Sequence, residues 1–381
     1  MYRSPFSYSS RASLDNQIYN NKSISNKSPC SRDRFVSPSN KSPLRSPNRE
    51  NIGSNCEFSS AKKSGTPTTP KSRKAPIVKD SVLDAPYVLN DFPTKLIDFN
   101  DDGCLAVALG TSVYLWNNNE EVVEMMSGTT VINSLCWMDE GLVISGSGHI
   151  ELWDVQRQCA IQAFDDHDER AVGMSSYGHR LATGGHDGVI RVTDSRSGNS
   201  TTFTGHRGEI CALSWSMDGA YLASGGNDNQ VYIWGSHVQK RVPHDSPIQS
   251  LAWGNSGILY TGESGESGQI QMIRMKSDDE PKVVLSGSPL SGLCWMEEWG
   301  LIASHNGSSS AWETWSPDLK KIGSYTGHAS GILNLASCSQ KSLVSTIGSD
   351  ETLRIWQLSE PLTSASPRTR SPSPFGNPFI R

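Results

Sequence analysis

Apolar and polar residues alternate along residues 82–358 in short runs that Gly, Asp and Asn separate. Alternation with a period of two predicts β-strands that bury one face, and the separating residues favour tight turns. Seven of these strands end in similar strings, such as Val-Tyr-Ile-Trp at Trp234. The seven ends lie 37 to 42 residues apart, at Trp116, Trp153, Thr193, Trp234, Ile273, Trp315 and Trp356. The pattern predicts one β-rich unit that is repeated seven times.

One repeat shows the residues of this unit most completely. A Gly-His pair ending at His206 precedes an apolar strand, a turn containing Asp228, and the strand that ends at Trp234. This arrangement is typical of a WD-repeat blade, in which the Asp accepts hydrogen bonds from the His and the Trp packs against both. Seven such repeats of about 40 residues predict an all-β fold, the seven-bladed β-propeller. Thr193 and Ile273 replace the Trp, so blades three and five are expected to be less regular.

A propeller has to join its last blade to its first, and an added N-terminal strand is the usual device. Segment 82–92 precedes blade one and is the candidate for this strand. With this closure, Asp91 is expected beside the blade-seven turn that carries Asp350 and Glu351, although 260 residues separate Asp91 from Glu351 in the sequence.

The segments that flank the propeller have a different composition. Residues 1–79 are rich in Ser, Asn, Lys, Pro and Arg, and residues 359–381 are rich in Ser, Pro and Thr. Such segments bury too little apolar surface to offset an ordering entropy of roughly 1–2 kcal/mol per residue, so both are expected to be disordered. The expected organisation is a basic regulatory tail over 1–79, a propeller over 80–358 and a second disordered tail over 359–381.

Charge also divides the chain. Residues 1–80 carry 15 Lys and Arg against 5 Asp and Glu, whereas residues 81–358 carry 16 against 33. An acidic propeller repels phosphate groups and attracts basic peptides, so binding of nucleic acid, including RNA, is not expected. No apolar run approaches the roughly 20 residues of a membrane span. The eight Cys lack zinc-site spacing and are interpreted as free thiols. A soluble protein of the nucleus and cytoplasm, without metal or cofactor, is expected.

Longer strings in the sequence point to a family. They are Val82-Leu-Asp-Ala-Pro86, Leu105-Ala-Val-Ala-Leu-Gly-Thr-Ser-Val-Tyr-Leu-Trp116, Gly225-Gly-Asn-Asp-Asn229, Asp350-Glu-Thr-Leu-Arg354 and the terminal Ile380-Arg381. Through them the chain resembles, over essentially its whole length, the fizzy and fizzy-related co-activators of the anaphase-promoting complex, a multisubunit ubiquitin ligase. The resemblance implies a substrate adaptor and activator of this ligase, with destruction-box proteins such as cyclins or securin as partners.

The resemblance also implies two motifs that dock on helical-repeat subunits of the ligase. One is the Ile380-Arg381 terminus with its free carboxylate. The other is a C-box, whose first residues match Asp33, Arg34, Phe35 and Val36. The family continues with Ile-Pro-x-Arg, but here Ser-Pro-Ser-Asn follows, so a weakened contact is expected. Ser42 and Ser46 match the pattern of proline-directed cell-cycle kinases, which predicts regulation by phosphorylation.

Two degron receptors follow from the resemblance. Asp91 and Glu351 match the acids that bind the Arg of an Arg-x-x-Leu destruction box, where each hydrogen bond is worth about 1.5–3 kcal/mol. The residues that match the receptor for Lys-Glu-Asn peptides are Asp98, Asn227 and Asn229. The family's Thr, Gln and Arg of this receptor are replaced by Gly265, Ser309 and Gly331, so the receptor is expected to be weakened or lost.

No catalytic constellation accompanies the His residues, which the Gly-His positions explain, so no enzymatic activity is expected. The divergent C-box and second receptor favour a specialised, meiotic or developmental member of the family, with checkpoint or meiotic inhibitors among its partners. The main alternative is a WD-repeat scaffold or substrate receptor of another assembly, such as a cullin ligase or a chromatin complex. Such a protein would share the fold and the acidic charge but would not need the Ile-Arg terminus.

Overall fold

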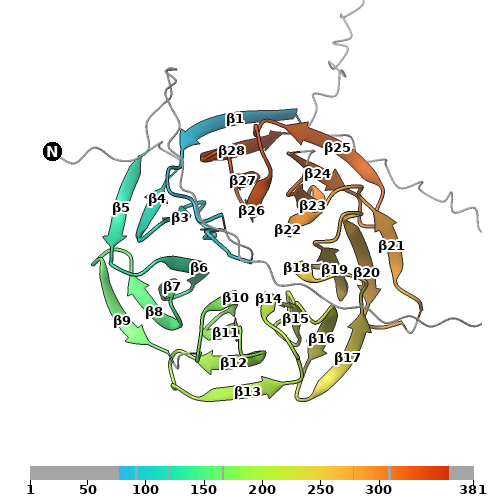
Figure 1. The fold of residues 1–381 in the computed structure, drawn as a ribbon, viewed down its shortest axis with the longest axis horizontal. Helices are drawn as coiled ribbons and strands as arrows, with labels where there is room; N and C mark the ends of the chain where they lie inside the picture. The colour runs from blue at the N-terminus through green and yellow to red at the C-terminus, as the bar shows by residue number, and fades with distance from the viewer. Residues whose placement is uncertain are drawn as a thin grey trace, which may run out of the picture. The chain divides into compact units, whose positions relative to one another are not determined.

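The computed structural model describes residues 77–90, 93–117, 121–164, 167–277, 279–307 and 310–359. These residues form a ring of seven four-stranded antiparallel sheets (Figure 1), and no helix is present among them. The seven-bladed propeller expected from the sequence is confirmed. The C-box residues, the two candidate phosphorylation sites and the Ile-Arg terminus all lie outside the described residues.

Each sheet is one blade, and in six of the blades the four strands follow one another in sequence from the centre of the ring to its rim. Blades one and two consist of β2 (Ile97–Phe99), β3 (Leu105–Leu109), β4 (Ser112–Trp116), β5 (Val122–Ser127), β6 (Ile132–Met138), β7 (Gly141–Gly146), β8 (His149–Asp154) and β9 (Cys159–Ala163). Blades three and four consist of β10 (Ala171–Tyr177), β11 (Arg180–Gly185), β12 (Val189–Asp194), β13 (Ser200–Thr204), β14 (Ile210–Trp215), β15 (Leu222–Gly226), β16 (Gln230–Trp234) and β17 (Val238–Pro243).

Blades five and six consist of β18 (Ile248–Gly254), β19 (Ile258–Glu263), β20 (Gln269–Arg274), β21 (Lys282–Leu285), β22 (Leu290–Met296), β23 (Gly300–His305), β24 (Ala311–Trp315) and β25 (Lys321–Thr326). Blade seven combines both ends of the propeller. Its strands are β26 (Ile332–Cys338), β27 (Leu343–Gly348), β28 (Thr352–Ser359) and, on the outside, β1 (Ile77–Asp84).

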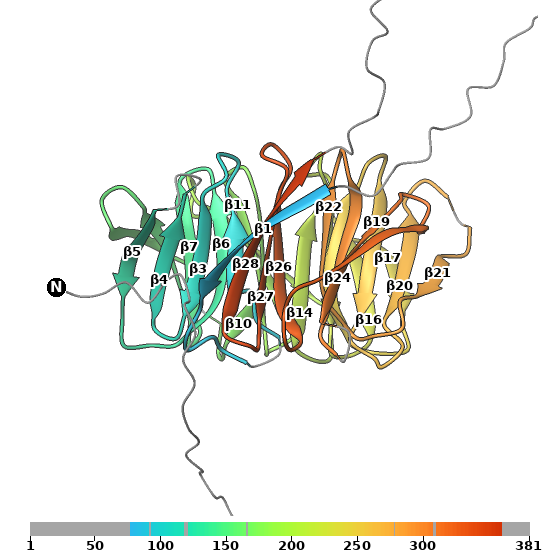
Figure 2. The ribbon, with the colours of Figure 1, turned by 90° about the horizontal axis from the view of Figure 1, so that it is seen from above.

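The pairing of β1 with β28 closes the ring, as Figure 2 shows along the edge of the disc. Leu83 pairs with Leu353, and both side chains are buried in the same apolar cluster. The closing strand was expected over 82–92, but β1 begins at Ile77 and ends at Asp84. The residues that precede Val82 are held by backbone hydrogen bonds to β28, and Val78 also packs against an apolar cluster.

The second strand of several blades is buried on both faces. All residues of β3, β15 and β23 are buried, because each blade is covered by a neighbouring blade on either side. The outer strands are more exposed, as in β9, whose residues are exposed except for Gln162. The core is therefore a series of apolar layers between blades, in which each fully buried aliphatic side chain contributes about 1.5–3 kcal/mol.

A chain of hydrogen bonds fixes blade four internally. The indole N–H of Trp234 donates to Ser224 Oγ (2.8 Å), which lies 2.7 Å from His206 Nε2. The other ring nitrogen, Nδ1, lies 2.9 Å from an oxygen of Asp228. This network assigns the proton of His206 to Nδ1, because the serine hydroxyl that accepts from Trp234 is free to donate to Nε2.

Blade seven repeats the network with His328, Thr346, Asp350 and Trp356. Blade three keeps the His and the Asp, since His167 Nδ1 lies 3.2 Å from Asp187. Blades three and five, which were expected to be less regular, are complete four-stranded sheets like the other blades. Thr193 and Ile273 replace the Trp without loss of pairing, since both side chains are buried in its place and strand pairing uses only backbone atoms.

Candidate functional site

The antiparallel strands place the turns of each blade alternately on two faces of the ring. The face that carries the turns between second and third strands is called the front face here, and Figure 1 is viewed from it. The back face carries the turns between first and second strands. Glu351 lies in the β27–β28 turn and Asn227 and Asn229 lie in the β15–β16 turn, so all three belong to the front face.

Glu351 is exposed and adopts a left-handed backbone conformation, with φ at 55°. Its carbonyl oxygen accepts a hydrogen bond from the Ala85 amide at 2.7 Å. The chain that leaves β1 therefore passes directly beside the Glu351 turn on its way to blade one. This is the juxtaposition of blades one and seven expected from ring closure, but Asp91 itself lies outside the described residues.

The same crossing segment borders a hollow of about 380 Å³ in blade one. It is lined by Pro86, Tyr87, Leu109, Gly110, Thr111, Ser112 and Tyr114. Tyr87 is 80% exposed, although it is aromatic, and its φ of 63° is in the left-handed region. This hollow is not apparent from the sequence, because only the closure of the ring brings residues 86–87 against β3 and β4.

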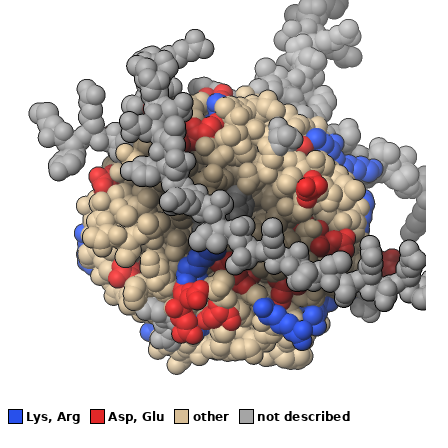
Figure 3. Space-filling view, viewed as in Figure 1, with Lys and Arg blue, Asp and Glu red and all other residues tan. Residues whose placement is uncertain are grey.

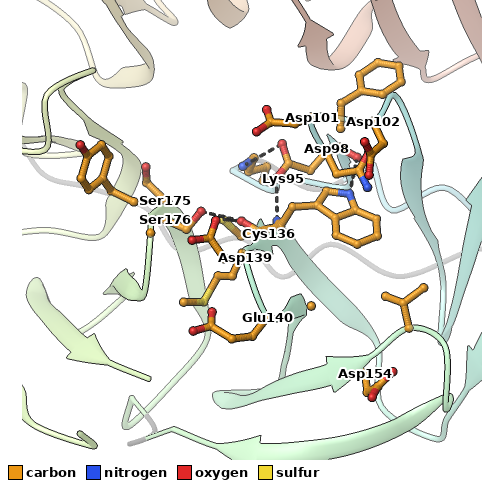
Figure 4. A pocket seen from close by; sticks show the side chains of 18 of the residues that line it. Lys95, Asp98, Asp101, Asp102, Cys136, Asp139, Glu140, Asp154, Ser175 and Ser176 are labelled. Carbon is orange, nitrogen blue, oxygen red and sulfur yellow. Dashed lines mark hydrogen bonds and ion pairs between the residues drawn. The ribbon is translucent and has the colours of Figure 1, made fainter. Parts of the chain in front are cut away.

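Of the three residues expected to bind Lys-Glu-Asn peptides, Asn227 and Asn229 share a front-face turn, and Asp98 lines the central channel of the ring together with Cys211, which contacts Asn227. Asp98 lies in β2 close to its back-face turn, where it accepts a hydrogen bond from the Trp137 amide (2.9 Å) and pairs with Lys95 (3.3 Å), as Figure 4 shows. Asn227 and Asn229 lie at the opposite ends of the strands, on the front face. Of the substituted positions, Gly265 and Gly331 are described and Ser309 is not.

An ion pair between Arg170 and the buried Glu209 holds the side chain of Asn227. Glu209 is 5% exposed and accepts two hydrogen bonds from Arg170, at 2.7 and 3.2 Å, and one from the Asn227 amide at 3.3 Å. The thiol of Cys211 donates to the other end of the Asn227 amide. Figure 3 shows acidic side chains around a basic one near the centre of this face, over the part of the ring where Figure 1 labels β10 and β14. The amide of Asn227 is therefore already engaged within the protein.

The back face carries a hollow of about 950 Å³ between blades one, two and three (Figure 4). Its walls include the carboxylates of Asp98, Asp101, Asp102, Asp139, Glu140 and Asp154. Burial alone would lower the pKa of Lys95 inside it, but the charge of Asp98 outweighs burial and the pKa lies above its usual value. The hollow therefore contains one cation, Lys95, which is paired with Asp98, and several further acidic side chains.

Other kinds of site are not found in the part of the chain that the structure describes. No three His, Cys, Asp or Glu residues there are grouped in a way that could hold a metal ion. The six described cysteines are unpaired, and three of them are buried. None of the described segments is a helix long and apolar enough to cross a membrane.

Comparison with known proteins agrees with the polar networks of the blades. The family model of the WD domain, G-beta repeat, matches residues 158–194, 198–235 and 319–357. These segments contain most of blades three, four and seven, the blades with a His–Asp pair. One chain of the crystal structure of the mitotic checkpoint complex is similar over 78% of this chain and 99% of its own length, with 28% identity and a TM-score of 0.69.

Several curated proteins are similar over most of the chain. WD repeat-containing protein slp1 of Schizosaccharomyces pombe is 31% identical over 80% of this chain and 67% of its own length. Cell division cycle 20.1, cofactor of APC complex, of Arabidopsis thaliana is 30% identical over 80% of this chain and 72% of its own length. B-type cell cycle switch protein ccs52B of Medicago truncatula is 31% identical over 79% of this chain, which spans 65% of that protein. The chain belongs to the fizzy and fizzy-related family of WD-repeat proteins.

Proposed function

We propose that the protein is a non-enzymatic adaptor and activator of the anaphase-promoting complex that presents destruction-box proteins to this ligase. Two observations support the proposal. Relatives that are 30–31% identical are named as cofactors of the APC complex. In addition, the hydrogen bond from Ala85 to Glu351 brings the segment that leads to Asp91 to the blade-seven turn, and this observation carries the assignment of the site.

The proposed receptor has two parts. The carboxylates of Glu351 and Asp91 bind the guanidinium of the peptide's Arg, a pairing in which each charge-assisted hydrogen bond is worth about 1.5–3 kcal/mol. The hollow beside Tyr87 takes the Leu, because it offers apolar surface and Tyr87 is unusually exposed for an aromatic residue. In an extended peptide the Arg and the Leu of Arg-x-x-Leu are about 10 Å apart.

Local electrostatics suit this role. The nearest cation in sequence, Arg354, is held by Asp80 at 2.9 Å, and no side-chain partner of Glu351 is present among the described residues. Glu351 therefore keeps an exposed carboxylate on a propeller with 33 acidic and 16 basic residues. Such a surface attracts basic peptides and accelerates their encounter with the site.

The test is reconstituted ubiquitination of a destruction-box substrate by co-activator-free ligase. The unmodified protein, the Asp91→Ala and Glu351→Ala variants and their double variant are compared. Glu266→Ala is the matched control, because Glu266 is an exposed acid in the corresponding turn of blade five. Each receptor variant is expected to lower the rate at limiting substrate about tenfold or more, since about 1.4 kcal/mol corresponds to a factor of ten. The control is expected to match the unmodified protein.

Full activity in the double variant would place substrate recognition elsewhere on the propeller. No activity of any form would contradict the activator role and favour the scaffold alternative. A variant with one residue added after Arg381 distinguishes the activator from the scaffold, because only the proposed docking on the ligase needs a free carboxylate on Arg381.

We further propose that binding of Lys-Glu-Asn peptides is weak. The amide of Asn227 is engaged by Glu209, and Gly265 and Gly331 supply no side-chain donor or acceptor. A fluorescence-polarisation titration compares a Lys-Glu-Asn peptide with a destruction-box peptide. Equal affinity for the two would contradict this part of the proposal.

A further inference from the structure

The hollow beside Tyr87 is bordered on its outer side by a carboxylate. Ser112 lines the hollow, and its hydroxyl lies 3.4 Å from Glu124 Oε1 and 2.9 Å from Ser127 Oγ. Tyr114 also lines the hollow and pairs with Glu124 between β4 and β5. Hydroxyl groups of blade one therefore connect the wall of the hollow to Glu124, which lies on the outermost strand of the blade.

Glu124 is exposed, and no basic side chain forms an ion pair with it in the part of the chain that the structure describes. Burial raises the pKa of the Tyr114 hydroxyl, a hydrogen bond with Ser112 opposes this increase, and the negative charge of Glu124 adds to it. The carboxylate is thus open to a ligand from solvent, and its charge acts on a residue that lines the hollow.

A chain of contacts places the hollow between Glu351 and Glu124. The carbonyl of Glu351 accepts a hydrogen bond from the Ala85 amide at 2.7 Å, and Tyr87 follows two residues later. Tyr87 and Ser112 both line the hollow, and Ser112 contacts Glu124. A peptide whose Arg reaches Glu351 and whose Leu fills the hollow therefore continues towards Glu124. Residues two apart in an extended peptide point to the same side, about 6.5–7 Å apart, so the second residue after the Leu faces this carboxylate.

We propose that Glu124 selects destruction boxes that carry Lys or Arg two residues after the Leu, with the pattern Arg-x-x-Leu-x-Lys or Arg-x-x-Leu-x-Arg. This inference rests on the proposed function, because the hollow has to hold the Leu. The basic side chain lays its apolar stem along the rim of the hollow and donates a charge-assisted hydrogen bond to the carboxylate. An acidic residue at the same place is repelled, so the site discriminates in both directions.

The expected preference is moderate, since Glu124 is exposed to solvent. Ion pairs at such positions are weak and are screened by salt, which corresponds to about a two- to fivefold difference in Kd at low ionic strength. A preference of this size ranks substrates without excluding any of them. Glu124 therefore sets the order in which competing destruction-box proteins are bound.

Two fluorescein-labelled peptides test the proposal, Gly-Arg-Ala-Ala-Leu-Ala-Lys-Gly and the same peptide with ε-N-acetyl-lysine, which loses the charge. Each is titrated with the full chain and followed by fluorescence polarisation at low and at high salt. At low salt the unmodified protein should bind the lysine peptide about two- to fivefold more tightly, and Glu124→Gln should bind both peptides equally. Glu121→Gln is the matched control, because Glu121 is an exposed acid directly before β5, and it should keep the preference.

Equal Kd values of the unmodified protein for the two peptides would overturn the proposal, and so would a lysine preference that persists in Glu124→Gln. The double variant Asp91→Ala, Glu351→Ala, titrated with the acetyl-lysine peptide, tests the proposed function separately, because this peptide brings no charge to Glu124. Weaker binding by the double variant supports the receptor even when no lysine preference is found. Undiminished binding by the double variant would contradict the receptor, and failure of the unmodified protein to bind either peptide would overturn both.

Discussion

Glu263 offers a direct test of how burial controls the stability of the propeller. It is the last residue of β19 in blade five and is 1% exposed. By its pairing with Ile248 it occupies the position that Gly226 has in blade four. Its Oε1 accepts a hydrogen bond from Gln269 at 3.0 Å. Blade five therefore carries a carboxylic acid at a position where blade four has a glycine.

Burial raises the pKa of Glu263 from an ordinary value of 4.5 to about 7, and the charge of Asp245 adds to this effect. The amides of Asp245 and Ser246 and the side chain of Gln271 oppose it but do not cancel it. The folded protein therefore holds this proton more tightly than the unfolded chain does. Its contribution to stability is complete below about pH 4.5 and is lost as the pH rises to about 7.

The size of this loss follows from the shift in pKa. One pKa unit corresponds to about 1.4 kcal/mol, so a shift from 4.5 to about 7 corresponds to roughly 3 kcal/mol above pH 7. Glutamine resembles the protonated acid and does not ionise. Glu263→Gln is therefore expected to be more stable than the unmodified protein by roughly 3 kcal/mol at pH 8 and equally stable at pH 4.5.

Thermal unfolding of both proteins between pH 4.5 and 8.5 measures this difference. A change of roughly 3 kcal/mol should separate the midpoints by roughly 5–10 °C at pH 8 for a domain of this size. Glu266→Gln is the matched control, because Glu266 is exposed in the turn that follows Glu263. Parallel pH profiles for Glu263→Gln and the unmodified protein would refute the reasoning, and so would a lower midpoint of the variant at pH 8.

Four further substitutions test the fold, each by its unfolding midpoint in urea. Trp234→Phe keeps an aromatic ring but removes the N–H that Ser224 accepts, and should cost about 1–3 kcal/mol; no loss would contradict the network of blade four. Gly268→Ala should cost more than about 3 kcal/mol, because the new Cβ would lie 1.7 Å from the Ser288 carbonyl oxygen and the backbone has a positive φ. Gly198→Ala, also at positive φ but with nothing within 4 Å, should cost only about 1 kcal/mol, and equal costs would refute the clash. Leu83→Ala should cost about 2–5 kcal/mol if β1 is part of the core, and under 1 kcal/mol if it is not.

The repeat was predictable because two independent periodicities agree. The alternation of apolar residues locates strands, and the spacing of about 40 residues locates blades, so β4, β16 and β24 end at the predicted Trp116, Trp234 and Trp315. Both the blade motif and the alternation depend on local sequence, so one amino-acid sequence is enough to locate the strands and the blades.

Features that depend on contacts between distant segments were predicted less well. The closing strand was placed about five residues late, because the residues from Ile77 onward are held by pairing with β28 and show little alternation of their own. The acids expected to bind the destruction box came from family resemblance, because nothing in the local sequence around Asp91 or Glu351 distinguishes them from other turn acids.

Closure by β1 has a consequence for synthesis of the chain on the ribosome. β1 is made first among the described strands, but its partner β28 is complete only when Ser359 has been added, 282 residues after Ile77. At about 5–20 residues per second this interval lasts roughly 15–60 seconds. During that time the apolar side of β1 and the open edge of the growing ring remain available to other chains. Newborn molecules should therefore depend on protection from aggregation until their final blade is translated, and truncated chains lacking β28 should be recognised as misfolded.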